Sequence, residues 1–409
     1  MRLNKEAVVE KVFFITMGIY FFLSAMTVTM VDSIEIVDKV ATLTRYICYL
    51  VFVVVIIANV VTSKTGNYFK RFVVDFFQYA RSHVILILAL LTTMLIFIRT
   101  RERLPLILVV IIWACSFYDF KKIAKTYLYA SALLMMLAWM LSITGKIANI
   151  WVWREGKLRY SIGYVYPLET MSHFLFMILA YIYIVGKKFK AKDFLVINMI
   201  SILLYYITEA RASFALIFLS SLAAFLYAKI NMEKLLKVIF PWIGYLLLAV
   251  CVLFSLGGGI AYSESSSLLV KIDSVISHRF EMMRNAFTNY GFSLFCKKIE
   301  WVGYGGLNDA IVETAGRYNF VDCAYAKMLL DYGIIFSILV LIGYAVIYYT
   351  ASKAQDYALI IAISVVLVIS VMEPRLVSIE MNPFVVLLGS FFLYSRGNKK
   401  KLADAGGLG

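Results

Sequence analysis

The chain has 409 residues, of which 62% are hydrophobic and only 16% are charged. Soluble domains are closer to half apolar and a quarter charged, so this composition excludes an ordinary soluble protein. The net charge of +15 occurs in nucleic-acid-binding proteins too, but in so apolar a chain it indicates basic loops beside anionic lipid. We therefore expect membrane lipid, and no nucleic acid, as a partner.

The apolar runs are long and continuous, and the chain has only 5 prolines and 22 glycines. A β-barrel would show short alternating segments instead, so helices are favoured. The predicted fold class is all-α, a polytopic integral membrane protein. The first apolar run, residues 12–30, is followed by no small-residue cleavage site before Asp32, and we expect it to be retained as a membrane span.

Twelve stretches are apolar enough to cross a membrane, which takes roughly 20 residues, or fewer in short or tilted helices. They cover residues 12–30, 43–61, 83–98, 105–118, 127–143, 165–185, 194–208, 212–228, 236–256, 332–350, 357–372 and 383–395. This places nine membrane helices in 1–256, a long extracytoplasmic loop with amphipathic helices in 257–331, three membrane helices in 332–398 and a disordered basic cytoplasmic tail in 399–409.

The distribution of charge between the loops predicts the orientation. With the N-terminus inside, the inside segments hold 22 of the 40 Lys and Arg residues and 8 of the 25 Asp and Glu residues. Inside loops then carry +14 and outside loops +1. Because basic residues collect on the cytoplasmic side, this agreement supports both the count and cytoplasmic N- and C-termini.

The loop 257–331 is the longest segment that is not a predicted span. It opens with three glycines at 257–259 and carries His278, Arg279, Arg284 and Arg317. We expect it to form the lid and part of an active site held by the spans. Cys296 and Cys323 lie in or near it and could pair or remain free thiols. The 5 cysteines form no CxxC pair, so no metal site is predicted.

Three arginines are candidates for gripping a diphosphate, since a guanidinium donates two parallel hydrogen bonds to phosphate oxygens and stays charged. Arg211 lies in YYITEARASFAL between two spans; alternatively it pairs with Glu209 or snorkels to lipid. Arg279 and Arg284 lie in SHRFEMMRNAF, about 140° apart if helical. Their alternative role is the polar face of an interfacial amphipathic helix.

Asp322 is the candidate general base. It begins a pattern in which Tyr325, Ala326, Leu329 and Leu330 follow on one helical face. A carboxylate at the membrane edge can accept the proton of an attacking sugar hydroxyl. The alternative is an N-cap that satisfies free amides at the helix start. Lys327 and Asp331 form an i,i+4 pair that we interpret as structural.

The remaining candidates are polar or aromatic residues beside predicted spans, each of which could contact sugar or phosphate. Tyrosines 160, 164 and 166 fit an interfacial aromatic belt and could equally stack on sugar rings. His173, inside the sixth span, is interpreted as a buried polar contact. The predicted substrate-binding residues are Arg159, Glu209, Arg317, Tyr325, Glu373 and Asn382, the last two in the polar turn EPRLVSIEMN.

Several of these stretches together resemble the bacterial O-antigen and capsule repeat-unit polymerases of the Wzy type and the related O-antigen ligases. The resemblance rests on the TEARAS arginine, the arginines of the long loop, the GYGG turn at 303–306, the pair Asp322–Cys323 followed by Gly333, and the final E…N turn. The ligases have His-Asn where this chain has Asp322 and Cys323. The family element GF-H-P-N is matched by GYVYPL at 163–168, in which Tyr166 and Leu168 replace its His and Asn, so that stretch receives no catalytic role.

The resemblance implies a glycosyltransferase of the bacterial cytoplasmic (inner) membrane that needs no metal or other cofactor. It would join undecaprenyl-diphosphate-linked oligosaccharide repeat units at the outer face with inversion of configuration. Asp322 would be the base, and Arg211, Arg279 and Arg284 would neutralise the leaving diphosphate. The expected partners are the flippase and the chain-length regulator of the same pathway. The alternatives are a glycan ligase, a flippase or transporter of lipid-linked oligosaccharide, and a structural component of a polysaccharide complex.

Overall fold

The computed structural model describes residues 5–60, 83–154, 156–229, 233–303 and 318–392. Its described part is helical apart from one two-stranded hairpin, and eight helices are long and apolar enough to cross a membrane. The predicted helical membrane class is therefore confirmed. Three further apolar helices, α4, α5 and α16, have 10 to 17 residues.

The helices in the first half of the chain coincide with the predicted spans. Their ends lie within a few residues of the predicted ends, except where a helix extends further into the adjoining loop. The elements are α1 (Lys5–Met26), α2 (Glu35–Val60), α4 (Val84–Thr100), α5 (Leu104–Cys115), α6 (Phe120–Ile143), β1 (Trp151–Arg154), β2 (Lys157–Tyr160), α7 (Pro167–Val185), η1 (Gly186–Lys188), α8 (Ala191–Thr208) and α9 (Arg211–Lys229).

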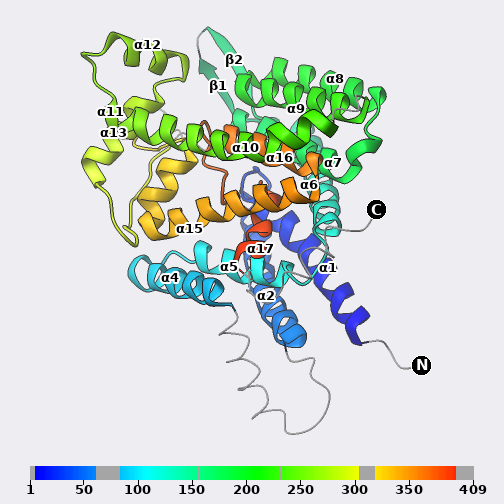
Figure 1. Cartoon of the computed structure of the whole chain (residues 1–409). Coiled ribbons are helices and arrows are strands. Elements are labelled where there is room, and N and C mark those ends of the chain that lie inside the picture. The colour runs from blue at the N-terminus through cyan, green and yellow to red at the C-terminus, as the bar shows by residue number, and fades with distance from the viewer. Residues whose placement is uncertain (1–4, 61–82, 155, 230–232, 304–317, 393–409) are drawn as a thin grey trace.

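The second half contains the predicted loop and the last spans. Its elements are α10 (Glu233–Val252), the π-helical turn η2 (Leu253–Gly257), α11 (Gly258–Ala261), α12 (Ser267–Val275), α13 (Arg279–Tyr290), α15 (Ala324–Ala354), α16 (Tyr357–Ile369), the 3-10 helix η3 (Pro383–Leu388) and α17 (Gly389–Phe392). Figure 1 shows α11, α12 and α13 on one side of the molecule, at the left in this view, with α1 and α6 on the other.

Two boundaries differ from the sequence-based prediction. The three glycines at 257–259 do not open the loop, because the helical run of α10 continues through η2 and α11 to Ala261. The last predicted span, 383–395, is described only to residue 392, and this part is η3 followed by the single turn α17. Asn382 caps η3 by accepting a hydrogen bond from the amide of Phe384 at 3.1 Å.

The hairpin was not predicted. Its strands pair antiparallel from Trp151 opposite Tyr160 to Arg154 opposite Lys157. The alternation of large and polar residues in WVWREGKLRY fits this structure, with Gly156 at a positive φ of 79° in the turn. The hairpin joins α6 to α7 and contacts the end of α8, so it braces the same end of the bundle as the loop helices.

The core is formed by helices packed as neighbours in the sequence and across it. α1 packs against α2 and α6, α6 against α7, α9 against α7 and α16, and α10 against α15. α7 is the most enclosed of the candidate spans, with 67% of its apolar window buried. His173 on α7 is fully buried and its Nδ1 lies 2.8 Å from the hydroxyl of Tyr164, which confirms the predicted buried polar contact.

Candidate functional site

A cavity of about 1300 Å³ lies where the loop helices meet the ends of the membrane helices. Its wall draws on six separate parts of the chain: Tyr20 of α1, the α4–α5 junction, the hairpin with the start of α7, the loop from 277 to 303, the stretch 318–336 at the start of α15, and the turn 372–380. Pockets for small ligands span roughly 300–1,000 Å³, so this one has room for a larger molecule.

The turn after α16 is held rigidly by hydrogen bonds to its backbone. The hydroxyl of Tyr127, on α6, donates to the carbonyl of Met381 at 2.5 Å, and that of Tyr344, on α15, donates to the carbonyl of Leu376 at 2.7 Å. The side-chain Nδ2 of Asn382 donates to the same Leu376 carbonyl at 2.9 Å and to the Tyr344 hydroxyl at 3.1 Å. Because these groups are buried, the turn keeps one conformation and fixes the side chains that face the cavity.

Arg375 is the central cation of this turn. Its guanidinium forms an ion pair with Glu169, in the first turn of α7, and another with Glu380 at 3.8 Å. The three side chains are only 14%, 17% and 26% exposed, respectively, and all line the cavity. A charge so poorly solvated is tolerated only when opposite charges surround it, so the three groups act as one unit.

Glu373 lies beside this unit and is buried. Its carboxylate accepts hydrogen bonds from Ser172 at 2.6 Å and from Ser213 at 3.0 Å, which ties the turn to α7 and α9. Burial raises the pKa of Glu373 to about 7, although the two serines act in the opposite direction. Glu373 is therefore a group that exchanges its proton near neutral pH at the wall of the cavity.

The loop reaches the cavity through α13, which packs against α11 at two glycines. A β-carbon on Gly258 would lie 2.3 Å from the ring of Phe280, and one on Gly259 would lie 2.7 Å from Met283. Both positions thus need glycine for the two helices to approach so closely. This packing places Arg279, the first residue of α13, against the turn after α16.

Arg279 fastens the loop to the bundle. Its Nε and Nη2 donate to the carbonyl of Met372 at 3.2 and 2.8 Å, and its Nη1 donates to the carbonyl of Ile276 at 2.8 Å. Nη2 also lies 4.0 Å from a carboxylate oxygen of Asp322. A guanidinium has five N–H groups, so two remain for other acceptors. Sequence reasoning assigned both Arg279 and Asp322 to the site, and the structure brings them together.

Asp322 directly precedes the N-cap residue of α15. The N-cap of this helix is Cys323, whose side chain makes no capping hydrogen bond. The carboxylate of Asp322 is 32% exposed and lines the cavity. Its position on the cavity wall favours the first of the two roles considered from the sequence, that of a general base.

Gly333 interrupts α15 and lets the loop dock there. Its φ is 86°, and the amides of the next two residues, Ile334 and Ile335, donate to the carbonyls of Ser293 and Leu294 at 2.9 and 3.0 Å. A β-carbon on Gly333 would lie 2.3 Å from the backbone of Phe295, so other residues cannot be placed here without displacing the loop.

The predicted pair of Lys327 and Asp331 is confirmed, with 2.8 Å between Nζ and the carboxylate. Trp301 from the loop completes it. The indole donates to Asp331 at 2.6 Å, and the ammonium of Lys327 lies 4.2 Å from the indole ring centroid. This cluster fixes the extended loop segment on the first turns of α15.

The cavity wall has two electrostatic sides. The loop contributes mainly cations, whereas the bundle contributes mainly carboxylates around Arg375 and Lys327. The loop side carries His278, Arg279, Lys297 and Lys298, and the bundle side carries Glu102, Glu169, Asp322, Asp331, Glu373 and Glu380. The wall also carries aromatic rings, namely Tyr20, Trp153, Tyr166, Trp301, Tyr318, Phe320, Tyr332 and Phe336.

Six of the nine predicted site residues that the structure describes do not line this cavity, and four of these lie near the α8–α9 turn or on α13. Arg211 is exposed at the start of α9, and Glu209, just before it, pairs with Lys157 on the hairpin at 2.6 Å. The Nε of Arg159 donates to the carbonyl of Thr208 at 2.7 Å, in a buried position beneath the same turn. Arg284 is exposed on α13, where it donates to the carbonyl of Ile260 at 3.1 Å. Among the described residues, the arginines that line the cavity are Arg279 and Arg375.

Two other predicted contacts are buried among protein groups. The hydroxyl of Tyr325 donates to the carbonyl of Leu367 at 2.8 Å, so its ring faces α16, and Asn382 is committed to the turn described above. Arg317 and most of the GYGG turn lie outside the described residues. Cys296 and Cys323 are both buried free thiols, which resolves the alternative that they pair.

Sequence reasoning left Glu169, Arg375 and Glu380 out of the site. Their local sequences gave a usable signal, because an acidic residue in the first turn of the most enclosed span needs a nearby cation. Such a pairing between residues 206 positions apart could not be derived from one sequence.

No protein-family model, curated protein or solved structure matches this chain. The resemblance to repeat-unit polymerases therefore remains a prediction made from its sequence elements.

Proposed function

We propose that this chain is a membrane glycosyltransferase that joins undecaprenyl-diphosphate-linked oligosaccharide repeat units at the outer face of the bacterial cytoplasmic membrane. The observation that carries the proposal is the cavity of about 1300 Å³, in which a half-exposed Asp322 faces loop cations at one end of a bundle of apolar helices. The proposed topology keeps the N-terminus in the cytoplasm and nine crossings before the loop, which puts this end of the bundle outside.

The loop side of the cavity suits the donor. Two N–H groups of Arg279 and the ammonium groups of Lys297 and Lys298 are available to diphosphate oxygens, whose charge grows as the glycosidic bond breaks. Arg375 would act indirectly, by holding Glu169 and Glu380 in place on the cavity wall. Arg279 is the arginine proposed to contact the diphosphate, because Arg211 and Arg284 do not line the cavity.

The bundle side suits the acceptor sugar. Asp322 accepts the proton of the attacking hydroxyl, and the anomeric carbon passes through an oxocarbenium-like transition state before the new bond closes on the opposite face. The aromatic rings between the two sides offer apolar faces to sugar rings, and the carboxylates accept hydrogen bonds from their hydroxyls. A single displacement of this kind inverts the configuration.

A deletion strain that keeps the rest of its polysaccharide pathway tests the reaction class. Glycans on undecaprenyl diphosphate and at the surface are separated by gel and identified by mass spectrometry. Single repeat units at the outer leaflet without a ladder are expected. Units trapped at the inner leaflet would instead indicate a flippase, and lipid-linked polymer that is never transferred would indicate a ligase.

The purified protein gives a second test. It is incubated in detergent with a defined undecaprenyl-diphosphate repeat unit, and product linkages are determined by NMR. Elongated lipid-linked product with inverted anomeric configuration is expected. Retention of configuration would exclude the single displacement, and absence of any elongation by folded protein would contradict the proposal.

A further inference from the structure

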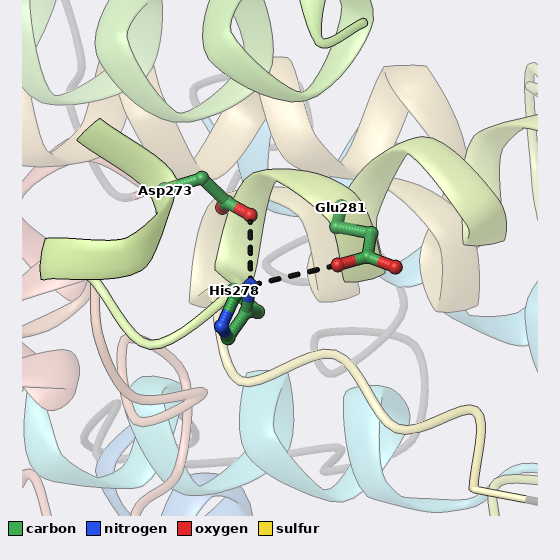
Figure 2. A group of neighbouring side chains, drawn as sticks. All are labelled: Asp273, His278 and Glu281. Carbon is green, nitrogen blue, oxygen red and sulfur yellow. Dashed lines mark ion pairs between the residues drawn. The ribbon is translucent and has the colours of Figure 1, made fainter. Parts of the chain in front are cut away.

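A histidine and two carboxylates converge at the junction of α12 and α13, beside the cavity (Figure 2). They are Asp273 near the end of α12, His278 just before α13 and Glu281 in the first turn of α13. The His278 Nδ1 lies 3.4 Å from Oδ2 of Asp273 and 3.6 Å from Oε2 of Glu281. One possible ligand atom from each of the three residues lies within 4.8 Å of the other two.

These separations fit a shared metal ion better than direct hydrogen bonds. An N–H···O hydrogen bond has its donor and acceptor about 2.7–3.2 Å apart. Zinc binds nitrogen and oxygen at about 2.0–2.2 Å with tetrahedral geometry, so neighbouring ligand atoms lie about 3.3–3.6 Å apart. Both measured distances from Nδ1 fall in that interval.

The buried carboxylate supplies an independent indication of a ligand. Asp273 is 0% exposed, and its Oδ1 accepts a hydrogen bond from the amide of Phe280 at 2.7 Å. Its Oδ2 accepts no hydrogen bond from any residue that the structure describes, and Figure 2 shows this carboxylate directed toward His278. A buried carboxylate oxygen without a donor is costly, and a cation at this point would remove the cost.

The backbone places the three groups in advance. Ser277 and His278 both have a φ of 60°, and the amide of His278 donates to the carbonyl of Asp273 at 2.8 Å. This tight turn brings the imidazole back over the end of α12, while Glu281 follows one helical turn later. The ligands therefore need little rearrangement to meet an ion.

We propose that Asp273, His278 and Glu281 bind one Zn²⁺ through Oδ2, Nδ1 and a carboxylate oxygen, with the fourth position open to water. Imidazole combined with carboxylates suits zinc, and three protein ligands leave one position free. The ion joins α12 to α13 and so steadies the loop that carries Arg279. The sequence offered no cysteine pattern for a metal, and this site uses none. The proposal does not depend on the glycosyltransferase function.

Zinc binding is measured on the full chain, purified without a histidine tag and stripped with EDTA. Competition with a chromophoric chelator gives affinity, and elemental analysis gives stoichiometry. We expect one Zn²⁺ per chain and at least about a tenfold weaker affinity in His278→Gln. The side chain of His278 is 62% exposed, so this variant should fold. Asp273→Asn is the second variant, because its amide oxygen can still accept from Phe280.

Two matched controls separate this site from casual surface binding. Glu300→Gln removes an exposed carboxylate of the same loop, and His83→Gln removes the other histidine that is not fully buried. Both should bind zinc as the parent does. X-ray absorption at the zinc edge should show nitrogen and oxygen ligands without sulfur, whereas a sulfur ligand would place the ion at a cysteine.

The proposal is overturned if the folded parent binds no zinc beyond adventitious levels, or if His278→Gln and Asp273→Asn bind it as tightly as the parent. In either case the three side chains are held by their contacts with the protein alone. Failure of repeat-unit polymerisation would leave this measurement unaffected, because it follows metal binding alone.

Discussion

Two turns of this molecule carry the same kinds of residues and use them differently. The turn between α8 and α9 holds Glu209 and Arg211, and the turn after α16 holds Glu373, Arg375 and Glu380. In the first turn the cation that pairs with Glu209 is Lys157, whose side chain is 63% exposed. In the second, Arg375 is only 14% exposed and faces the cavity.

The difference lies in what surrounds each turn. The α8–α9 turn is two residues long, with Glu209 at a φ of 49°. The Glu209 side chain is only 12% exposed, but its partner Lys157 and the neighbouring Arg211 are exposed at the surface. The turn after α16 is long enough to fold inward, and buried hydroxyls of Tyr127 and Tyr344 hold its backbone there. Charges in the inward turn are desolvated and therefore strongly coupled, whereas exposed charges are screened.

The largest contrast between the turns is expected on removing each arginine. Arg375→Met removes the ion-pair partner of Glu169 and Glu380, and breaking such a buried pair costs about 3–5 kcal/mol. We expect a clear fall in the thermal unfolding midpoint of the purified protein and loss of polymer. Arg211→Met is the matched control and should leave the midpoint nearly unchanged. Equal falls in the midpoint for the two substitutions would show that the two turns do not differ in their contribution to stability.

Asp322→Asn is expected to abolish activity without disturbing the fold. The substitution keeps the shape of a half-exposed side chain but removes the group proposed to accept the proton, and loss of a general base typically lowers rates about 10²–10⁴-fold. Polymer yield at matched expression and the elongation rate in detergent measure this effect. Glu300→Gln, an exposed carboxylate of the same loop, serves as control. Near-normal yield from Asp322→Asn would exclude its role as the base.

The raised pKa of Glu373 predicts that the stability of the folded protein depends on pH. Its pKa is raised in the folded protein to about 7, from a usual value of 4.5, so the unfolded chain ionises first as pH rises. Its contribution to stability is therefore present below about pH 4.5, declines through the interval up to pH 7, and changes no further above it. The full change is about 3 kcal/mol.

Glu373→Gln should remove that decline, which is measured as the unfolding midpoint of parent and variant from pH 4 to 8. A parent whose stability rises over this interval, or a variant with the same slope, would contradict the assignment. Glu209→Gln, in the turn between α8 and α9, is the control substitution, and its unfolding midpoint is measured over the same pH range.

The smallest effects are expected in the outward turn. Lys157→Gln removes an ion pair with an exposed ammonium, and solvent screening leaves such pairs with little effect on stability. Arg211→Lys should likewise keep near-normal polymer yield, because Arg211 lies outside the cavity. The sequence-based role of Arg211 as a diphosphate clamp predicts impairment instead, since lysine lacks the paired donors. Impaired polymerisation by folded Arg211→Lys would restore that role.

The sequence was sufficient for the membrane helices because their signal is local. Long apolar runs identify the spans one at a time, and eleven of the twelve predicted stretches coincide with helices in the described residues. The segment after Asn382 was misjudged, since a buried apolar run has the same composition whether it forms an α-helix or η3. The hairpin was missed for a related reason, as its strands have only four residues each.

The site was predictable only in part because it depends on contacts between distant segments. Arg279 and Asp322 were identified from residue type and position, and they do meet at the cavity. Tyr325 shares a helical face with cavity residues in sequence, yet its hydroxyl is satisfied by Leu367 from α16. The partnership of Arg375 with Glu169 depends on how α7 and the turn after α16 pack, which no local pattern contains.

The break at Gly333 gives the first part of α15 a fixed length. The loop backbone bonds to Ile334 and Ile335 at one end of this stretch, and Asp322 stands at the other. Each residue of a helix advances the chain by about 1.5 Å and rotates it by about 100°, so one inserted residue would turn Lys327 or Asp331 away from the wall. Between Asp322 and Gly333 the number of residues is therefore constrained more tightly than most of their identities.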